Sequence, residues 1–440
     1  FSRREFLGKT ISTGVAVSAV PFIKKSSIYG KQSSKKYRIA LIGTGSRGTG
    51  MWGANLIHDW SDCVELVGLC DPNKKRVEIA KGIIRTNAPT FTDFDEMMKT
   101  TKPDMLIVTT VDATHYKYIT GGMEYGSDII TEKPMATDEE QCQAIIDAQK
   151  KTRKKIIVTF NYRYGAVHEK AKEVLLSGDI GRITSLDFHW YLDINHGADY
   201  FRRWHAFKEK SGSLFVHKAT HHFDLVNWWL DAEPVDVFAY GELHKYGKNG
   251  SFRGKNCRTC RYKDKCDFYW DITTNKRYMD IYVKAESEDG YLRDGCVYRN
   301  EINIWDTMTV LVKYNSDVQM SYSLNAFMPY EGYKVSFNGT KGRLDVRMWE
   351  RQPWDEPRLG EIRVTKNFGN SRVINIPHAT GGHGGGDPKL KDMIFKSNIP
   401  DPLNQAAGLR GGAMSILTGI AARHSVEENR HVRISELVKF

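Results

Sequence analysis

The sequence predicts an α/β protein in two parts, a doubly wound parallel sheet followed by an α/β domain built on a large, mostly antiparallel sheet. Three observations support this prediction. Apolar strands alternate with helical stretches up to about residue 160, which is typical of parallel sheets. A glycine-rich turn follows the first strand. Beyond residue 180, polar and apolar residues alternate, as in antiparallel strands with one buried face.

The individual elements follow from these patterns. A chain of 440 residues exceeds one ordinary core, so two or three domains are expected. Buried strands separated by helices are predicted at 39–42, 63–71, 104–110, 128–134 and 155–163. The alternating segments are 182–193, 234–244, 307–327, 333–348 and 361–377, with turn sequences such as YNSD and NGTKG at their joints. Helices are expected to close the chain at about 388–398, 404–424 and 433–439.

The first 36 residues have the pattern of a targeting signal. They hold eight Lys or Arg against Glu5, which supplies +7 of the net charge of +11 and leaves +4 for the rest. The paired arginines of SRREFL (Ser2–Leu7), a short apolar run and a small-residue VSA site predict twin-arginine export of the folded protein to the periplasm. A disordered basic tail is the alternative. The apolar run is shorter than the ~20 residues of a membrane span, so no stable membrane anchoring is expected.

Composition also bears on nucleic acid as a partner. A basic chain can bind nucleic acid when its charge lies in aromatic-studded tracts or in a helix-turn-helix. Most of the excess charge here lies in residues 1–36, and neither pattern occurs in the sequence. No nucleic-acid partner is therefore expected.

The turn GTGSRG (Gly43, Gly45, Ser46, Arg47, Gly48) has the spacing of a dinucleotide site. It follows a predicted strand and precedes a helix, so its glycines permit backbone N–H groups to approach a pyrophosphate. Asp71 ends the second strand, where a carboxylate accepts hydrogen bonds from the adenosine ribose and repels a 2′-phosphate. NAD is the expected cofactor, while Arg47 and the basic cluster 74–76 leave NADP open.

A further motif, Glu132-Lys133-Pro134, follows the fifth strand at the edge where open α/β sheets bind ligands. The order of the glycine turn, Asp71, this motif, NYRY (161–164) and a His-x-x-Asp helix resembles the Gfo/Idh/MocA family of oxidoreductases from about residue 37 to 440.

The resemblance implies a domain organisation and an activity. It implies a Rossmann NAD(P)-binding domain over 37–160 and a C-terminal substrate-binding and oligomerisation domain over 161–440. A Cys-rich insertion is expected at about 245–300. The open sheet of such proteins often forms the subunit interface, so a homodimer or homotetramer is expected. The implied activity is NAD(P)-dependent oxidation or reduction of sugars, polyols or related carbonyls.

The resemblance also implies site residues. Lys133 would lie near the nicotinamide and the reacting hydroxyl, where an ammonium stabilises a developing alkoxide. Glu132 and Lys133 join the cofactor-binding set, with Thr109, Thr110 and His115 on the nicotinamide side. The residues expected to contact substrate in the interdomain cleft are Asn161, Arg163 and Tyr164. Hydrogen bonding between the domains is the alternative role for Arg163 and Tyr164.

The segment 217–224 contains His217, His221 and Asp224. By its match to the family motif, His221 is the expected proton acceptor, and His217 stands where the family usually has an aspartate. Residues i and i+4 share a helix face, so both histidines can face the substrate. Zinc binding by this pair and a purely structural role remain alternatives. We expect His221→Ala to abolish hydride transfer while leaving cofactor binding intact.

Four cysteines fall in the expected insertion, at Cys257, Cys260, Cys266 and Cys296. A C-x-x-C pair with two further cysteines predicts a structural zinc site. An iron–sulfur cluster or two disulfides are the alternatives. In each case the expected role is structural.

The segment HATGGHGGGDPKL (378–390) combines flexible glycines with a helix start, at which Asp387 is expected to be the N-cap and Pro388 the first helical residue. This pattern predicts either a linker or a mobile loop whose His383 closes over the substrate.

The function predicted from these features is hydride transfer between NAD and a hydroxyl or carbonyl of a sugar or glycoside. Aromatic residues in HWYLD, DYFRRWH and DFYWD would suit stacking on pyranose rings, or belong to the core. One alternative is an NAD-dependent glycosidase-like enzyme, which oxidises its sugar transiently, eliminates the aglycone and returns the hydride. Another is a non-catalytic sugar- or nucleotide-sensing protein.

Overall fold

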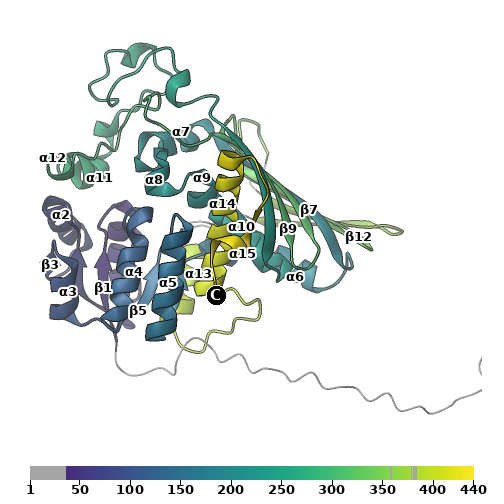
Figure 1. The fold of residues 1–440 in the computed structure, drawn as a ribbon, viewed down its shortest axis with the longest axis horizontal. Helices are drawn as coiled ribbons and strands as arrows, with labels where there is room; N and C mark the ends of the chain where they lie inside the picture. Colours follow the sequence, from purple (N-terminus) through teal and green to yellow (C-terminus); the bar gives the residue numbers. More distant parts are fainter. Residues whose placement is uncertain (1–35, 357–358, 378, 380–383) are drawn as a thin grey trace, which may run out of the picture.

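The computed structural model describes residues 36–440 except 357–358, 378 and 380–383. The predicted export signal and His383 therefore lie outside the described residues. Within them the chain forms a parallel sheet with helices on both sides, a larger second sheet, and an inserted segment that reaches back to the first sheet (Figure 1). No described helix is both long and apolar enough to cross a lipid bilayer.

The first sheet confirms the predicted doubly wound arrangement. Its six strands are parallel in the order β3-β2-β1-β4-β5-β6. They are β1 (Tyr37–Ile42), β2 (Val64–Cys70), β3 (Thr90–Phe91), β4 (Met105–Val108), β5 (Asp128–Thr131) and β6 (Ile156–Val158). The strand order reverses between β1 and β4, so loops at their carboxyl ends diverge and leave room for a ligand.

Helices cover both faces of this sheet, as the continuous apolar strands require. They are α1 (Asn55–Asp59), α2 (Lys74–Ile84), α3 (Phe94–Thr101), α4 (His115–Glu124) and α5 (Glu139–Thr152). A late helix, α13 (Gly386–Phe395), also packs here, because its Leu390, Met393 and Phe395 are buried in the core of this sheet. Trp60 donates a hydrogen bond of 2.8 Å to Asp392 of α13. Residues from the end of the chain therefore complete the first core.

The second sheet has nine strands in the order β14-β13-β12-β11-β7-β10-β9-β8-β15 and is antiparallel except at β7 and β10. The strands are β7 (Ile183–Asp193), β8 (Pro234–Glu242), β9 (Thr307–Tyr314), β10 (Gln319–Met328), β11 (Glu331–Gly339), β12 (Gly342–Arg351), β13 (Leu359–Lys366), β14 (Ser371–Pro377) and β15 (Val432–Arg433). Alternate residues of β9 are buried and exposed, as the period of two predicts. The mostly antiparallel sheet is confirmed.

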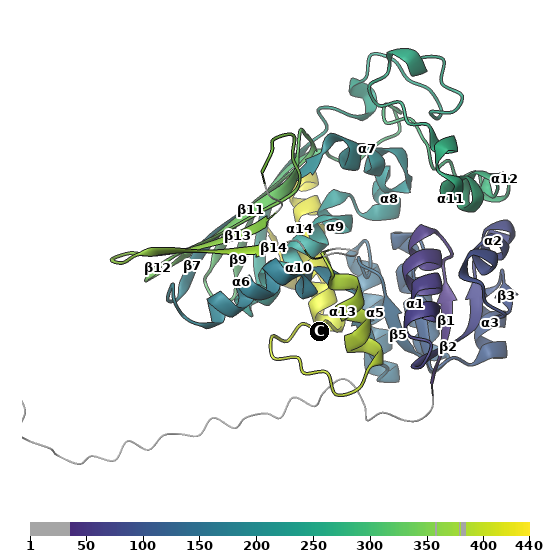
Figure 2. The same cartoon turned by 180° about the vertical axis from the view of Figure 1, so that it is seen from behind.

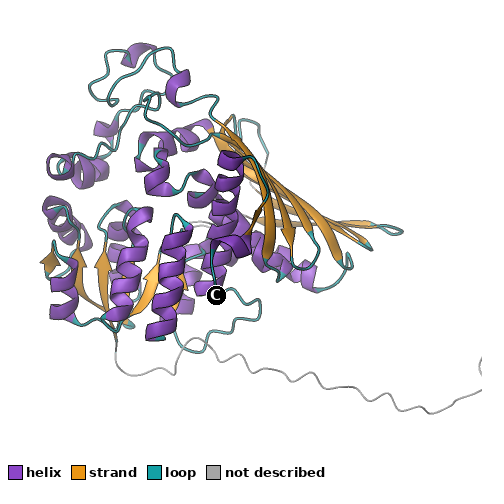
Figure 3. Cartoon of the chain, in the orientation of Figure 1, coloured by secondary structure: helices purple, strands orange, loops and turns teal. Residues whose placement is uncertain are grey.

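Helices lie against one side of the second sheet (Figures 2 and 3). They are α6 (Ala166–Leu176), α7 (Ile194–Arg202), α8 (Lys208–Ser211), α9 (Leu214–His217), α10 (Ala219–Leu230), α14 (Leu409–Glu428) and α15 (Ile434–Leu437). The Met414, Leu417 and Ile420 side chains of α14 are buried in a core shared with the sheet. The histidines of the segment 217–224 therefore lie between the sheet and the first domain.

The inserted segment, residues 243–306, connects β8 to β9 and has little regular structure. Its short helices α11 (Lys276–Tyr278) and α12 (Glu286–Asp289) flank a π-helical turn, Met279–Val283. Both helices lie beside α2 of the first domain (Figures 1 and 2). The insertion thus covers the carboxyl-end side of the parallel sheet.

Candidate active site

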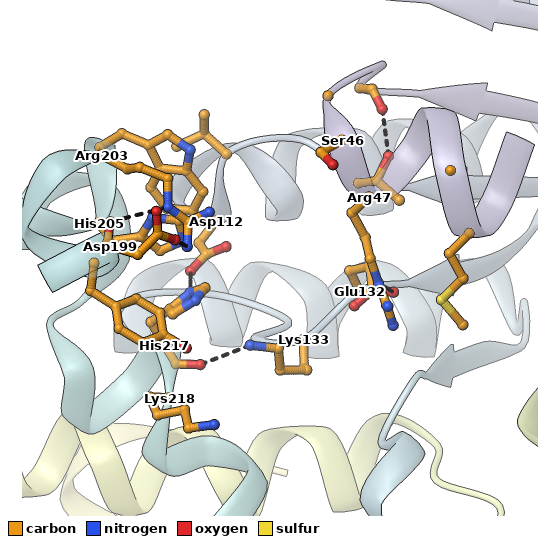
Figure 4. Close-up of a pocket in the computed structure, with 18 of the residues that line it drawn as sticks. Ser46, Arg47, Asp112, Glu132, Lys133, Asp199, Arg203, His205, His217 and Lys218 are labelled. Atoms are coloured by element: carbon orange, nitrogen blue, oxygen red, sulfur yellow. Dashed lines mark hydrogen bonds and ion pairs between the residues drawn. The ribbon is translucent and has the colours of Figure 1, made fainter. Parts of the chain in front are cut away.

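A cleft of about 1580 Å³ runs from the carboxyl ends of β1 and β2 to the start of β11. Its walls come from the first domain, from α7–α9 and from the inserted segment. Most of the predicted cofactor and catalytic residues line it. Those present are Gly43, Gly45, Ser46, Arg47, Asp71, Thr109, Thr110, His115, Glu132, Lys133, Asn161, His217 and His221. Figure 4 labels Ser46, Arg47, Glu132, Lys133 and His217 among them.

The glycine turn packs too tightly against its neighbours to accept a side chain. Gly43 has a φ of +90°, and a Cβ there would lie 2.6 Å from the carbonyl carbon of Thr109. A Cβ on Gly48 would lie 2.1 Å from the carbonyl oxygen of Gly43. The hydroxyl of Thr109 closes the turn by donating to that same oxygen at 2.6 Å. Such a turn lets a pyrophosphate approach the backbone closely, so the residues fit NAD.

Asp71 is 5% exposed and held in place on both carboxylate oxygens. Thr44 donates to Oδ2 from its backbone N–H at 2.8 Å and its hydroxyl at 3.0 Å, and the backbone N–H of Asn73 donates to Oδ1 at 3.0 Å. The carboxylate therefore sits at the end of β2 with a fixed orientation. That is the position from which an acid binds the adenosine ribose.

Arg47 contacts other protein groups in the cleft. Its Nε donates to Glu132 Oε1 at 2.7 Å, and its NH1 lies 3.3 Å from Asp387. Asn161 also donates to Asp387, at 2.6 Å. Asp387 is therefore not the N-cap that the sequence predicts, since α13 already begins at Gly386. Its carboxylate instead draws α13 toward the cofactor turn.

Lys133 is half-buried, and its ammonium donates to the backbone carbonyl of His217 at 3.0 Å. Burial lowers the pKa of Lys133 to about 8, although the nearby Asp112 and Glu132 carboxylates oppose the shift. A lysine with this pKa carries its positive charge at neutral pH and loses it just above. It can therefore stabilise an oxyanion in the cleft.

Asp112 and His217 form a buried pair next to Lys133 (Figure 4). The Nδ1 of His217 lies 2.5 Å from Asp112 Oδ2, which joins residues 105 positions apart. Burial, reinforced by Lys133, lowers the pKa of His217 well below its usual value, so the imidazole is neutral at pH 7. Burial raises the pKa of Asp112, against the pull of Lys133 and Arg203. The pair resembles a base and its orienting carboxylate.

Asp112 is absent from the sequence-based predictions. The sequence feature that could have identified Asp112 as a site residue is its place in TTVDATHY, directly after β4. The loop at that position must face the ligand-binding edge of the sheet. Its partner could not be anticipated from sequence, because His217 enters from the other domain.

His221 lies one turn further along and contacts aromatic rings. Its ring stacks on Tyr162 with centroids 4.3 Å apart, and it is 5% exposed. The ammonium of Lys218 donates to the Tyr162 hydroxyl at 3.3 Å and lies 4.7 Å from the centre of the Trp190 ring. His221 thus lines the cleft beside the buried Lys218.

Two of the predicted substrate contacts lie outside the cleft. Arg163 pairs with Asp224 through two hydrogen bonds of 2.8 and 2.6 Å, and Tyr164 is buried in the first core. Neither lines the cleft, where the predicted substrate contacts would lie. Asp224 belongs to the same predicted domain (161–440) as Arg163, so this pair is not the interdomain hydrogen bond offered as the alternative. His115 lines the cleft, but its ring nitrogens lie 2.7 and 3.1 Å from the carbonyls of Pro134 and Thr110. It braces the Lys133 loop.

The four cysteines of the insertion converge but do not form the predicted metal centre. Cys257, Cys260, Cys266 and Cys296 all line one small cavity, and each is a free thiol. Among the described residues, no group of three or more Cys, His, Asp or Glu side chains is arranged to hold a metal ion. The predicted zinc site therefore gains no support, and the same holds for the two disulfides.

The far end of the cleft carries polar residues that the sequence-based prediction missed. Glu331 is 1% exposed and accepts hydrogen bonds from His196 at 2.6 Å and Arg351 at 3.1 Å. Burial raises the pKa of Glu331, but the bond to His196, with smaller contributions from Asp193 and Lys218, outweighs it and lowers that pKa to about 2. A fixed carboxylate here can accept hydrogen bonds from substrate hydroxyls.

Two family models match the chain. One, described as an oxidoreductase family with an NAD-binding Rossmann fold, matches residues 37–160. The other, described as the C-terminal α/β domain of the same oxidoreductase family, matches residues 172–434. Together they span both sheets and most of the cleft, whose lining also includes residues between the two matches.

Individual relatives agree with these matches. A Bacillus subtilis (strain 168) protein named YteT and described as an oxidoreductase is 39% identical over 422 residues, which covers 91% of this chain and 98% of YteT. D-glucoside 3-dehydrogenase of Escherichia coli (strain K12) is 27% identical over 157 residues, covering 34% of this chain and 42% of that enzyme. The Bordetella pertussis WlbA dehydrogenase, solved with NADH and UDP-GlcNAcA, shares the fold with a TM-score of 0.64 at 18% identity, over 91% of this chain and 99% of WlbA.

Proposed function

Because the chain belongs to the Gfo/Idh/MocA oxidoreductase family and has its NAD-binding Rossmann domain, we propose that it transfers hydride between NAD and a hydroxyl or carbonyl of a sugar or glycoside. The observation that carries the proposal is the Lys133–His217–Asp112 group, which lies in the same cleft as the glycine turn. Alcohol oxidation requires a base and a cationic group beside the nucleotide, which are here His217 and Lys133, and Asp112 orients the base.

NAD would supply the hydride acceptor, and the chain supplies proton transfer and charge stabilisation. Neutral His217 removes the hydroxyl proton through Nε2, while Asp112 holds the ring through Nδ1. The Lys133 ammonium stabilises the alkoxide that develops on the same oxygen. The resemblance to the family motif favours His221 for the proton, whereas the hydrogen bond to a carboxylate favours His217. His221 remains the alternative acceptor, since it lines the same cleft.

A sugar substrate is favoured by the composition of the cleft beyond Lys133. Tyr200 and Trp204 border the His217 ring, with centroids 5.4 and 5.8 Å from it, and offer faces on which a pyranose can stack. Glu331 and Glu350 add hydrogen-bond acceptors for ring hydroxyls. The D-glucoside dehydrogenase relative also acts on a glycoside by name.

Incubation with a panel of glycosides tests this proposal against its rivals. Build-up of NADH supports the dehydrogenase. Release of aglycone without NADH identifies the glycosidase-like route, which the histidine at position 217 favours because it departs from the usual family motif. A protein that binds NAD but gives neither signal is a sensor.

The pH dependence of oxidation is expected to have a plateau near neutrality. The rate falls above about pH 8, because Lys133 has a pKa lowered to about 8 by burial and loses its charge there. It falls on the acid side only well below pH 6.5, since burial lowers the pKa of His217. Initial rates of NADH formation from pH 5 to 10 measure both limbs. A basic limb that persists in Lys133→Met would contradict this assignment.

Two further proposals concern where and how the protein works. We propose export to the periplasm by the twin-arginine route, which the Ser2–Leu7 motif supports.

We also propose assembly into a homodimer or homotetramer through the second sheet. Exposed Leu311 and Tyr240 lie on adjacent strands of that sheet. Replacing both by lysine is expected to lower the mass measured by light scattering. An unchanged mass would place the interface elsewhere.

A further inference from the structure

The inserted segment makes direct contact with the residues that would bind the nucleotide. Arg277 donates to the backbone carbonyl of Ser46 at 2.7 Å, and the N–H of Ser46 donates to the Tyr282 hydroxyl at 2.8 Å. Asn73 donates to the backbone carbonyl of Ala285 at 2.9 Å. This segment therefore forms the outer wall of the nucleotide site, more than 200 residues away in sequence.

Arg76 lies where this wall meets the predicted ribose pocket. One guanidinium nitrogen is 3.4 Å from Asp71 Oδ1, and the other donates to Asp289 Oδ2 at 2.6 Å. Asp289 also accepts a hydrogen bond of 2.9 Å from Asn73. All three side chains border the cleft. The arginine is thus bound between an acid of the parallel sheet and an acid of the insertion.

The position of Arg76 matters because of what an arginine can do beside an adenosine ribose. A guanidinium there pairs with a 2′-phosphate, which is how many Rossmann domains accept NADP. Its Nε atom is buried with no hydrogen-bond partner among the described residues, so it keeps an unused donor. Two carboxylates, however, offset its positive charge and occupy both of its terminal nitrogens.

We propose that Asp289 is a second determinant of the preference for NAD over NADP, in addition to Asp71. It acts by holding Arg76 away from a 2′-phosphate and by adding a negative charge that repels that phosphate. The proposal rests on the proposed use of NAD. It makes the insertion part of the cofactor site, although the NAD-binding family model and the glycine motif place that site in the first domain.

The test measures binding of NAD⁺ and NADP⁺ to the full chain by calorimetry, which requires no substrate. Asp289→Asn keeps the shape of the side chain and removes its charge. We expect it to tighten NADP⁺ binding about tenfold relative to NAD⁺ binding, while the Kd for NAD⁺ changes less than threefold. The gain should disappear in the double variant with Arg76→Ala, and Asp289→Glu should retain the wild-type ratio.

Asp280→Asn is the matched control. Asp280 lies on the same segment and pairs with Lys276 and Lys284 of that segment. The proposal is overturned if Asp289→Asn weakens both nucleotides equally, leaves their ratio unchanged, or acts no differently from Asp280→Asn. A wild-type chain that binds neither nucleotide would instead overturn the proposed function, so the two failures are distinguishable.

Discussion

Replacing His217 by alanine is expected to lower the rate of NADH formation by about 10²- to 10⁴-fold, the usual contribution of a positioned general base. His217 is the histidine whose Nδ1 is tied to a buried carboxylate, so its ring is oriented before substrate arrives. The Kd for NAD should not change, because the glycine turn and Asp71 are untouched. Stopped-flow measurement of the first turnover separates loss of hydride transfer from slow product release.

Three further variants serve as comparisons for His217→Ala. His221→Ala measures the alternative proton acceptor, and a loss confined to that variant would return the role to His221. Asp112→Ala should cause a smaller loss than His217→Ala, since it removes the orienting group and keeps the base. His58→Ala, at an exposed site on α1, should retain full activity. Full activity in His217→Ala would refute the assignment.

The second large effect is expected at Lys133. Lys133→Met should lower the rate of oxidation by about 10²- to 10³-fold, the range seen when a group that stabilises an oxyanion is removed. The free energy of unfolding should fall by about 1–3 kcal/mol at most, since the His217 carbonyl loses its ammonium donor. Burial already lowers the pKa of this lysine, so the folded state disfavours its charge and an apolar side chain of similar length is tolerated. Thermal melts measured with the kinetics check both statements.

Lys172 offers a matched control for a buried lysine. Its ammonium donates to the Trp228 and Trp229 carbonyls, and it does not line the cleft. Lys172→Met should leave the rate within about twofold and lower stability, because two buried carbonyl groups lose their donor. If Lys133→Met behaved like this control, Lys133 would be a structural residue.

Parts of this protein could be read from the sequence because they depend on local position. A glycine turn after a first apolar strand, an acid after the second strand and a lysine after the fifth must meet at one edge of a parallel sheet, whatever the rest of the chain does. The same logic holds for the second sheet, because alternation with a period of two places every other side chain in the core. The described structure confirms both sheets.

The remaining features depend on contacts between distant segments. Asp112 meets His217 across the cleft, Arg163 meets Asp224 in the interior, and α13 returns to bring Asp387 beside Arg47. The family resemblance implied a substrate contact for Arg163, but a motif cannot show that a carboxylate already pairs with that guanidinium. Burial forces such charges to pair, and the fold decides with which partner.

The sequence by itself therefore determined the two sheets, the place of the nucleotide turn and the lysine beside it, because these follow from the periods of strands and helices. Only the tertiary structure decided that His217 has a carboxylate partner and that the insertion borders the cofactor site. Those pairings join residues 105 and 213 positions apart. No local pattern encodes them, since each depends on how two domains and a long insertion pack against one another.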